Sequence, residues 1–235
     1  YIKIRLCPAI LCSLASPLLT ATLILQHCSL TMAALCGLLF TFEFNQISQS
    51  RLIVTDGILY FFVALSIFAT ALEERYQTLP WLILQAFAAT CAFCTKFTAA
   101  GCFILIALSH IKILFIHNRR PDWFSILFIR GVIVSIIFFF FLYVIMVIHL
   151  KLMPKNGYGD LYMQQDFRKL SMPVRVFKLL AAMYRYNANL QIDHPYQSKW
   201  YQWPLCLYDP LFVSVDFNAR YIFLLSNPVA SILSL

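Results

Sequence analysis

The chain has 235 residues, of which 61% are hydrophobic and 12% are charged. Soluble domains carry about 45–50% apolar and about 25% charged residues, so this composition excludes an ordinary soluble domain. The net charge is +8, but the mean hydropathy of +0.77 excludes a nucleic-acid-binding module. Six glycines also argue against a glycine-rich channel filter or a phosphate-binding loop. The composition predicts a polytopic membrane protein.

Long apolar runs organise the first part of the chain, and a spanning helix needs about 20 apolar residues. Residues 6–45 are almost continuously apolar and are interrupted at Gln26 and the histidine after it, which predicts two helices joined by a tight turn. Residues 52–72 predict a third span, because Arg51 precedes them and a charged triplet that starts at Glu73 follows them.

Further apolar runs follow after that triplet. Residues 81–116 are too long for one span, and we expect two short spans with Lys96 at the turn between them. Residues 131–150 carry no charge and predict another span, and a further apolar stretch begins near Tyr221. Barrel strands would be about half as long and would alternate, so helices are expected. The expected fold is an all-α polytopic membrane protein with about six full spans and the start of a seventh.

The distribution of charge predicts three regions. We expect a transmembrane helical core over residues 1–150, an extracytoplasmic loop over 151–220 and the start of a further transmembrane helix over 221–235. The densest basic cluster is the Asn-Arg-Arg-Pro sequence at 118–121, which favours a cytoplasmic position and places the loop in the lumen or periplasm. The chain begins without Met and ends within an apolar run, so we expect it to be part of a longer protein.

One amphipathic helix is expected within the loop, from Pro173 to Asn187. Arg175, Lys178 and Arg185 fall on one arc of the helical wheel. The opposite arc is apolar and consists of Val176, Phe177, Leu180, Met183 and Tyr184. Such a helix lies flat on a membrane or packs on the protein's own spans. Either position is interfacial.

Charged residues at the predicted outer ends of the spans are the first candidates for function, because ionisable groups in a membrane are costly. These residues are Arg5, Glu43, Arg51 and Asp56. Asp56 lies about 140° from Arg51 on a helical wheel, so the two face different neighbours. They are either snorkelling or interhelical ion pairs, or a cluster that binds an anionic lipid head group, for which arginine offers a planar bidentate fork.

The segment from His194 to Pro204 is the most unusual in the chain. Its eleven residues include two Trp, two Tyr, a His and a Lys. Trp and Tyr form belts at membrane interfaces. Aromatic faces beside hydrogen-bonding groups are also typical of a sugar or peptide site. Both interpretations remain open from the residues alone.

Several of these blocks resemble the protein O-mannosyltransferase family, in the same order. Residues 42–62 contain an acidic residue, then Gln-Ser-Arg, an apolar pair, an Asp and a Phe-Phe pair. Thr95-Lys96-Phe97 is similar to the family's Ser-Lys-Trp turn, and Gly157 to Asp160 is similar to its Gly-x-Gly-Asp stretch. The His194 to Pro204 block resembles its re-entrant loop, and Arg5 lies where the family has an arginine at the start of its second span. The large β-trefoil (MIR) insert of most eukaryotic members is absent between Phe167 and His194.

The resemblance implies a GT-C-type glycosyltransferase. It implies inverting transfer of mannose from a polyprenyl- or dolichyl-phosphate-mannose donor to Ser or Thr hydroxyls of extracytoplasmic proteins. The residues expected to bind the donor phosphate and substrate are Arg5, Arg51, Lys96, His194, Ser198, Trp200 and Trp203. The residues expected to support them are Glu43, Asp56 and Asp160. The family's catalytic Asp-Glu pair is expected upstream of Tyr1, so the catalytic residue is unknown here.

The expected setting follows from the same resemblance. The membrane is that of the endoplasmic reticulum in a eukaryote or the plasma membrane in a bacterium, with membrane lipid as a partner and a homo- or heterodimer possible. No cofactor and no metal are expected, since no cluster has ligand spacing. One alternative is another lipid-phosphate-sugar enzyme, such as an aminoarabinose transferase. The other is a transporter, which usually shows inverted repeats and helices broken by Gly or Pro.

Overall fold

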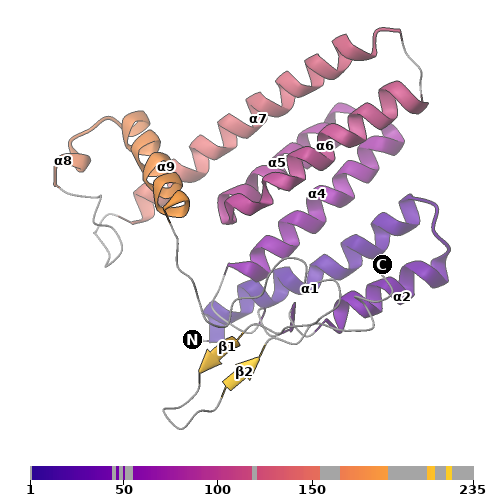
Figure 1. Ribbon diagram of the computed structural model, residues 1–235, viewed down its shortest axis with the longest axis horizontal. Helices are drawn as coiled ribbons and strands as arrows, with labels where there is room; N and C mark the ends of the chain where they lie inside the picture. The colour runs from indigo at the N-terminus through magenta and orange to yellow at the C-terminus, as the bar shows by residue number, and fades with distance from the viewer. Residues whose placement is uncertain are drawn as a thin grey trace. The chain divides into compact units, whose positions relative to one another are not determined.

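The computed structural model, drawn in Figure 1, describes residues 2–43, 46–47, 50, 55–117, 121–153, 165–189, 211–214 and 221–223. Most of these residues are helical, as expected. The α-helices are α1 (Ile2–Leu25), α2 (Leu30–Thr41), α4 (Asp56–Tyr76), α5 (Leu79–Thr95), α6 (Gly101–Ile111), α7 (Trp123–Leu152), α8 (Gln165–Arg168) and α9 (Met172–Ala188). A 3-10 turn, η1 (Phe97–Ala100), and a π-helical stretch, η2 (Lys112–His117), flank α6.

The two turns predicted inside the long apolar runs are confirmed. The first run breaks after Leu25, where His27 takes a left-handed backbone (φ 65°), and Ser29 then caps α2 by accepting a bond from the Met32 amide at 3.3 Å. The second run breaks at Lys96, whose extended backbone (φ −149°, ψ 134°) ends α5. A polar residue at a helix end can hydrogen-bond water or the backbone, which explains why the apolar runs turn at these positions.

Two helices extend past the charges that were expected to end them. α4 continues through Glu73 to Tyr76, and α7 begins at Trp123 and includes Arg130 before the expected start at 131. The reason is that the Arg130 guanidinium donates to the Glu73 carboxylate. Because each charge has its partner on the neighbouring helix, neither has to reach the membrane surface.

Helix α4 is the centre of the helical packing. It packs against α1 and α5 and also contacts α6, while α2 packs against α1 (Figure 1). A Cβ added to Gly57 would lie 2.7 Å from the Pro8 carbonyl oxygen, so α1 and α4 approach closely there. Alanines fill much of the buried surface of α4 and α5, and small residues of this kind let helices in lipid pack closely. This packing fixes the ends of α4 and α5 relative to each other.

Four helices in the described part of the chain are long and apolar enough to cross a membrane. They are Leu6–Leu25, Asp56–Tyr76, Phe97–Phe115 and Trp123–Leu152. The two other apolar helices, α2 and α5, have 12 and 17 residues and are shorter than an ordinary span. The chain is therefore an integral helical membrane protein, and six full spans remain an expectation.

The chain divides into two compact units, residues 1–137 with 194–235 and residues 138–193. In the second unit, α9 matches the predicted amphipathic helix to within one residue at each end. Val176 and Leu179 are buried, whereas Phe177 and Tyr184 of the predicted apolar arc are exposed. The buried face of α9 is therefore displaced from the predicted apolar arc, because Leu179 lies outside that arc.

Two short strands lie near the end of the chain. β1 (Leu211–Ser214) pairs antiparallel with β2 (Tyr221–Phe223), and Val213 is opposite Ile222. β-branched and aromatic residues suit such a pair. β2 occupies the start of the stretch where a helix was expected, and residues 224–235 lie outside the described residues.

Candidate functional site

An ion pair joins the start of α4 to the end of α5. The Lys96 ammonium donates to the Asp56 carboxylate, and the side chains are 44% and 21% exposed. Asp56 is in the first turn of α4, where the helix dipole favours a carboxylate. Lys96 stands between two helices with its amide bonded to the Ala92 carbonyl at 3.0 Å. A half-exposed ammonium held in this way can bind an anion from the solvent side.

Aromatic rings flank this ion pair. Phe93 and Phe97 stack on either side of Lys96 in the sequence, with ring centroids 5.0 Å apart and planes inclined by 24°. Phe61 and Phe62, one turn into α4, contact each other edge to face at 5.2 Å. Aromatic residues therefore lie on either side of Lys96 in the sequence and one turn after Asp56.

The start of α1 lies at the same end of the bundle. Pro8 of α1 closely approaches Gly57, the neighbour of Asp56, and Arg5 is one turn before Pro8. Only the backbone of Arg5 is described, within α1. The structure therefore brings the helix turns of Arg5, Asp56 and Lys96 to one end of the bundle.

The segment after α2 returns to this end as well. Glu43 follows α2 and its amide bonds the Phe40 carbonyl at 3.3 Å. Gln46 is buried, and its amide donates to the Cys12 carbonyl of α1 at 3.2 Å. The remaining predicted site residues lie outside the described residues: Arg51, Asp160, His194, Ser198, Trp200 and Trp203.

A second polar cluster, not predicted from the sequence, is buried near the other end of α4. Glu73 is 1% exposed and contacts Arg130 of α7, and its second oxygen is 3.5 Å from Nε2 of His110 on α6. That same His110 nitrogen is 2.9 Å from the Gln85 amide of α5. We call these four residues the Glu73 cluster. It connects one polar side chain from each of four helices.

The neighbouring carboxylate, Glu74, makes a separate set of contacts. It accepts bonds from Gln26 (2.9 Å), Ser109 (2.7 Å) and Lys112 (3.1 Å). These partners come from the end of α1, from α6 and from η2. The adjacent carboxylates Glu73 and Glu74 thus contact different side chains, because successive residues point about 100° apart on a helix.

A signal for the Glu73 cluster was present in the sequence. Gln85, His110 and Arg130 all stand in or beside apolar runs, and polar residues at such positions usually face one another. Glu73 directly follows the apolar run 52–72, and such a position predicts the boundary of a span and not a buried partner for these residues. Within the described ranges no group of three His, Cys, Asp or Glu side chains could hold a metal ion.

These features define a polytopic helical membrane protein with an accessible ion pair at one end of its bundle and a buried polar cluster near the other. A family model described as dolichyl-phosphate-mannose-protein mannosyltransferase matches residues 1–154. The chain belongs to this family, whose members are glycosyltransferases that use a dolichyl-phosphate-mannose donor and protein acceptors. The comparisons found no matching curated protein and no matching solved structure.

Proposed function

We propose that the chain forms the membrane core of a GT-C-type enzyme that transfers mannose, with inversion, from polyprenyl- or dolichyl-phosphate mannose to Ser or Thr hydroxyls of extracytoplasmic proteins. The observation that carries the proposal is the half-exposed Lys96 ammonium, held by Asp56 at the end of the bundle where α1 begins. The family match over residues 1–154 includes all of these elements.

The chemistry of the transfer explains why a cation is needed there. When the sugar leaves, the lipid phosphate gains negative charge, and a fixed cation stabilises that charge as it develops. Lys96 supplies one such cation, and Arg5 and Arg51 are the proposed further ones. His194 and Ser198 are proposed to contact the donor, and Trp200 and Trp203 to form walls for sugar or acceptor. Asp160 and Glu43 are proposed to support the loops in which they themselves lie.

The acceptor hydroxyl also needs a general base. The family resemblance assigns this role to an adjacent Asp-Glu pair, and no such dipeptide occurs in this sequence. Asp56 is bonded to Lys96 and is proposed to orient the ammonium. The enzyme works in the endoplasmic reticulum membrane or in a bacterial plasma membrane, as a monomer or as a dimer.

The test is a transfer assay with the full-length protein in proteoliposomes. The donor is polyprenyl-phosphate [³H]mannose, and the acceptors are a Ser/Thr-rich peptide and the same peptide with Ala at every Ser and Thr. We expect label in the hydroxyl-containing peptide alone. Label on a lipid other than the donor, separated from it by thin-layer chromatography, would support the aminoarabinose-transferase type of reaction instead, and no transfer to peptide or lipid would contradict the proposal.

Replacing Arg51 tests the proposed donor contact. Arg51→Lys keeps the charge and removes the bidentate fork, which is worth roughly 1.5–3 kcal/mol. We therefore expect transfer or donor affinity to fall by about tenfold to over a hundredfold, with the protein still inserted. Unchanged kinetics would remove Arg51 from the proposed site.

A further inference from the structure

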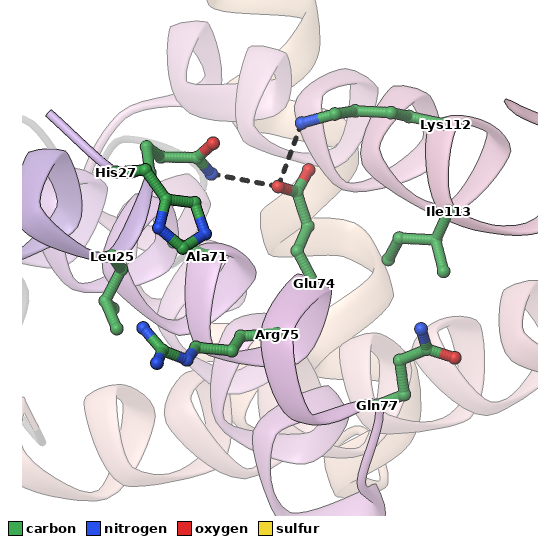
Figure 2. Close-up of a pocket in the computed structure, with 9 residues that line it drawn as sticks. Leu25, His27, Ala71, Glu74, Arg75, Gln77, Lys112 and Ile113 are labelled. Atoms are coloured by element: carbon green, nitrogen blue, oxygen red, sulfur yellow. Dashed lines mark hydrogen bonds and ion pairs between the residues drawn. The ribbon is translucent and has the colours of Figure 1, made fainter. Parts of the chain in front are cut away.

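A polar cavity of about 220 Å³ lies at the end of α4 that is remote from Lys96 (Figure 2). Asp56 and Glu74 are 18 residues apart on one helix, which corresponds to roughly 27 Å. The cavity is lined by Leu25, Gln26, His27, Ala71, Glu74, Arg75, Gln77, Lys112 and Ile113. These residues come from the ends of α1 and α4 and from η2. The proposed transferase reaction uses none of them.

Positive charge exceeds negative charge among the side chains that line the cavity. Glu74 is bonded to Lys112, so these two charges compensate each other. Arg75 is exposed, and its guanidinium carbon lies 5.8 Å from the centroid of the Tyr76 ring. In Figure 2 the guanidinium points away from Glu74, toward the side where His27 lies. An excess of positive charge therefore faces this side of the cavity.

The backbone around the cavity is also unusual. His27 (φ 65°) and Gln77 (φ 51°) are the two non-glycine residues with positive φ in the part of the chain that the structure describes, and both line the cavity. Lys112 begins the π-helical stretch η2, a conformation that is rare and frequent at functional sites.

Helix C-termini carry partial negative charge and would by themselves repel an anion. Here the turn after α1 bonds the carbonyls of its last turn: the amides of Gln26, His27 and Cys28 donate to Thr22, Ile24 and Leu23. The Gln77 amide likewise donates to the Glu73 carbonyl of α4 at 2.8 Å. These bonds reduce the repulsion, so the Arg75 charge dominates.

We propose that this cavity binds a phosphate group through the Arg75 fork. A guanidinium matches two phosphate oxygens, and Lys112 lines the same cavity while bonded to Glu74. The volume equals roughly seven water molecules, enough for a phosphate and part of its hydration. Basic pockets between membrane helices bind lipid head groups in this way. The phosphate belongs either to an anionic lipid or to a soluble compound.

The test compares two phosphate sources on the full-length protein in nanodiscs. One arm uses phosphatidylcholine discs with and without phosphatidic acid and counts bound phosphatidic acid by native mass spectrometry. The other arm titrates inorganic phosphate into phosphatidylcholine discs and follows the unfolding temperature. We expect Arg75→Gln to weaken binding at least tenfold in the arm that responds, and Arg75→Lys to weaken it less. The responding arm identifies the source.

Two control variants separate this cavity from other cations. Lys151→Gln removes an exposed cation that does not line the cavity, and Lys96→Gln removes the cation of the proposed donor site. Both should leave the Arg75-dependent binding unchanged. The proposal is overturned if Arg75→Gln binds like the wild type in both arms, or if phosphate binding depends on Lys96 alone. Loss of mannose transfer has no bearing on either outcome.

Discussion

The two ends of α4 each carry a carboxylate paired with a cation, and the pairs differ in their exposure. At the first end Lys96 and Asp56 are 44% and 21% exposed. At the other end Arg130 is 15% and Glu73 is 1% exposed, with His110 and Gln85 also buried. An accessible pair can exchange one partner for a ligand, whereas breaking a buried pair leaves a charge without compensation. The comparison supports the donor contact proposed for Lys96 at the first end and a stabilising role for the Glu73 cluster.

The largest effect is expected from Glu73→Leu, which leaves Arg130 without its carboxylate. Removing one partner of a buried pair destabilises a protein by about 3–5 kcal/mol. We expect a much lower unfolding temperature and poor yield of the full-length protein in detergent. The measurement is thermal unfolding followed by intrinsic fluorescence.

The double variant Glu73→Leu with Arg130→Met is the matched control. Replacing both members of a buried pair by apolar residues is often neutral. Recovery of most of the lost stability would confirm that the unpaired charge is the cause. If Glu73→Leu alone unfolds at the wild-type temperature, the Glu73 cluster does not stabilise the protein and the comparison fails.

An intermediate effect is expected from Gly57→Ala, beside Asp56. The added methyl would lie 2.7 Å from the Pro8 carbonyl oxygen, so α1 and α4 must move apart, at a cost of about 1–3 kcal/mol. Gly101→Ala is the control, because no atom lies within 4 Å of its added Cβ. We expect thermal unfolding to distinguish the two, with Gly101→Ala unchanged or slightly stabilised. Equal unfolding temperatures would show that the close approach of α1 and α4 is unimportant.

The smallest effect on stability is expected from Lys96→Met, although its effect on activity is large. An exposed ion pair contributes less than about 1 kcal/mol, so the unfolding temperature should change little. Mannose transfer should fall about tenfold or more, because the developing phosphate charge loses its cation. Lys151→Met, another exposed cation, serves as the control. A parallel loss of stability and activity would identify Lys96 as structural.

Sequence reasoning located the turns better than the ends of the helices. The breaks at Gln26 and Lys96 were predicted because polar groups interrupt runs too long for one span. The predicted end of α4 and the predicted start of α7 were wrong, because a charge next to an apolar run usually marks a membrane boundary and Glu73 and Arg130 do not. Their mutual pairing allows both helices to continue, and that pairing is a tertiary contact between residues 57 positions apart.

The candidate site also depends on a contact between residues that are distant in the sequence, which sequence patterns do not predict. The sequence indicated that Asp56 and Lys96 belong to the same end of the bundle, but it did not pair them. Asp56 was compared with Arg51, its neighbour in the sequence, whereas its partner lies 40 positions further along the chain. Residue spacing predicts contacts within one helix. Contacts between α4 and α5 depend on how the two helices pack. Their alanines determine that packing, and residue spacing does not predict it.

The unequal lengths of the helices have a consequence for the surrounding bilayer. At 1.5 Å per residue, the 12 residues of α2 are roughly 18 Å long and the 30 residues of α7 roughly 45 Å. A hydrocarbon core is about 30 Å thick, so it exceeds α2 and falls short of α7. Leu30, Leu35 and Leu38 of α2 are exposed, which leaves lipid to adapt around this helix. A span by α2 would require a locally thinner bilayer, whereas α7 can be accommodated by tilting, so the two helices make opposite demands on the surrounding lipid.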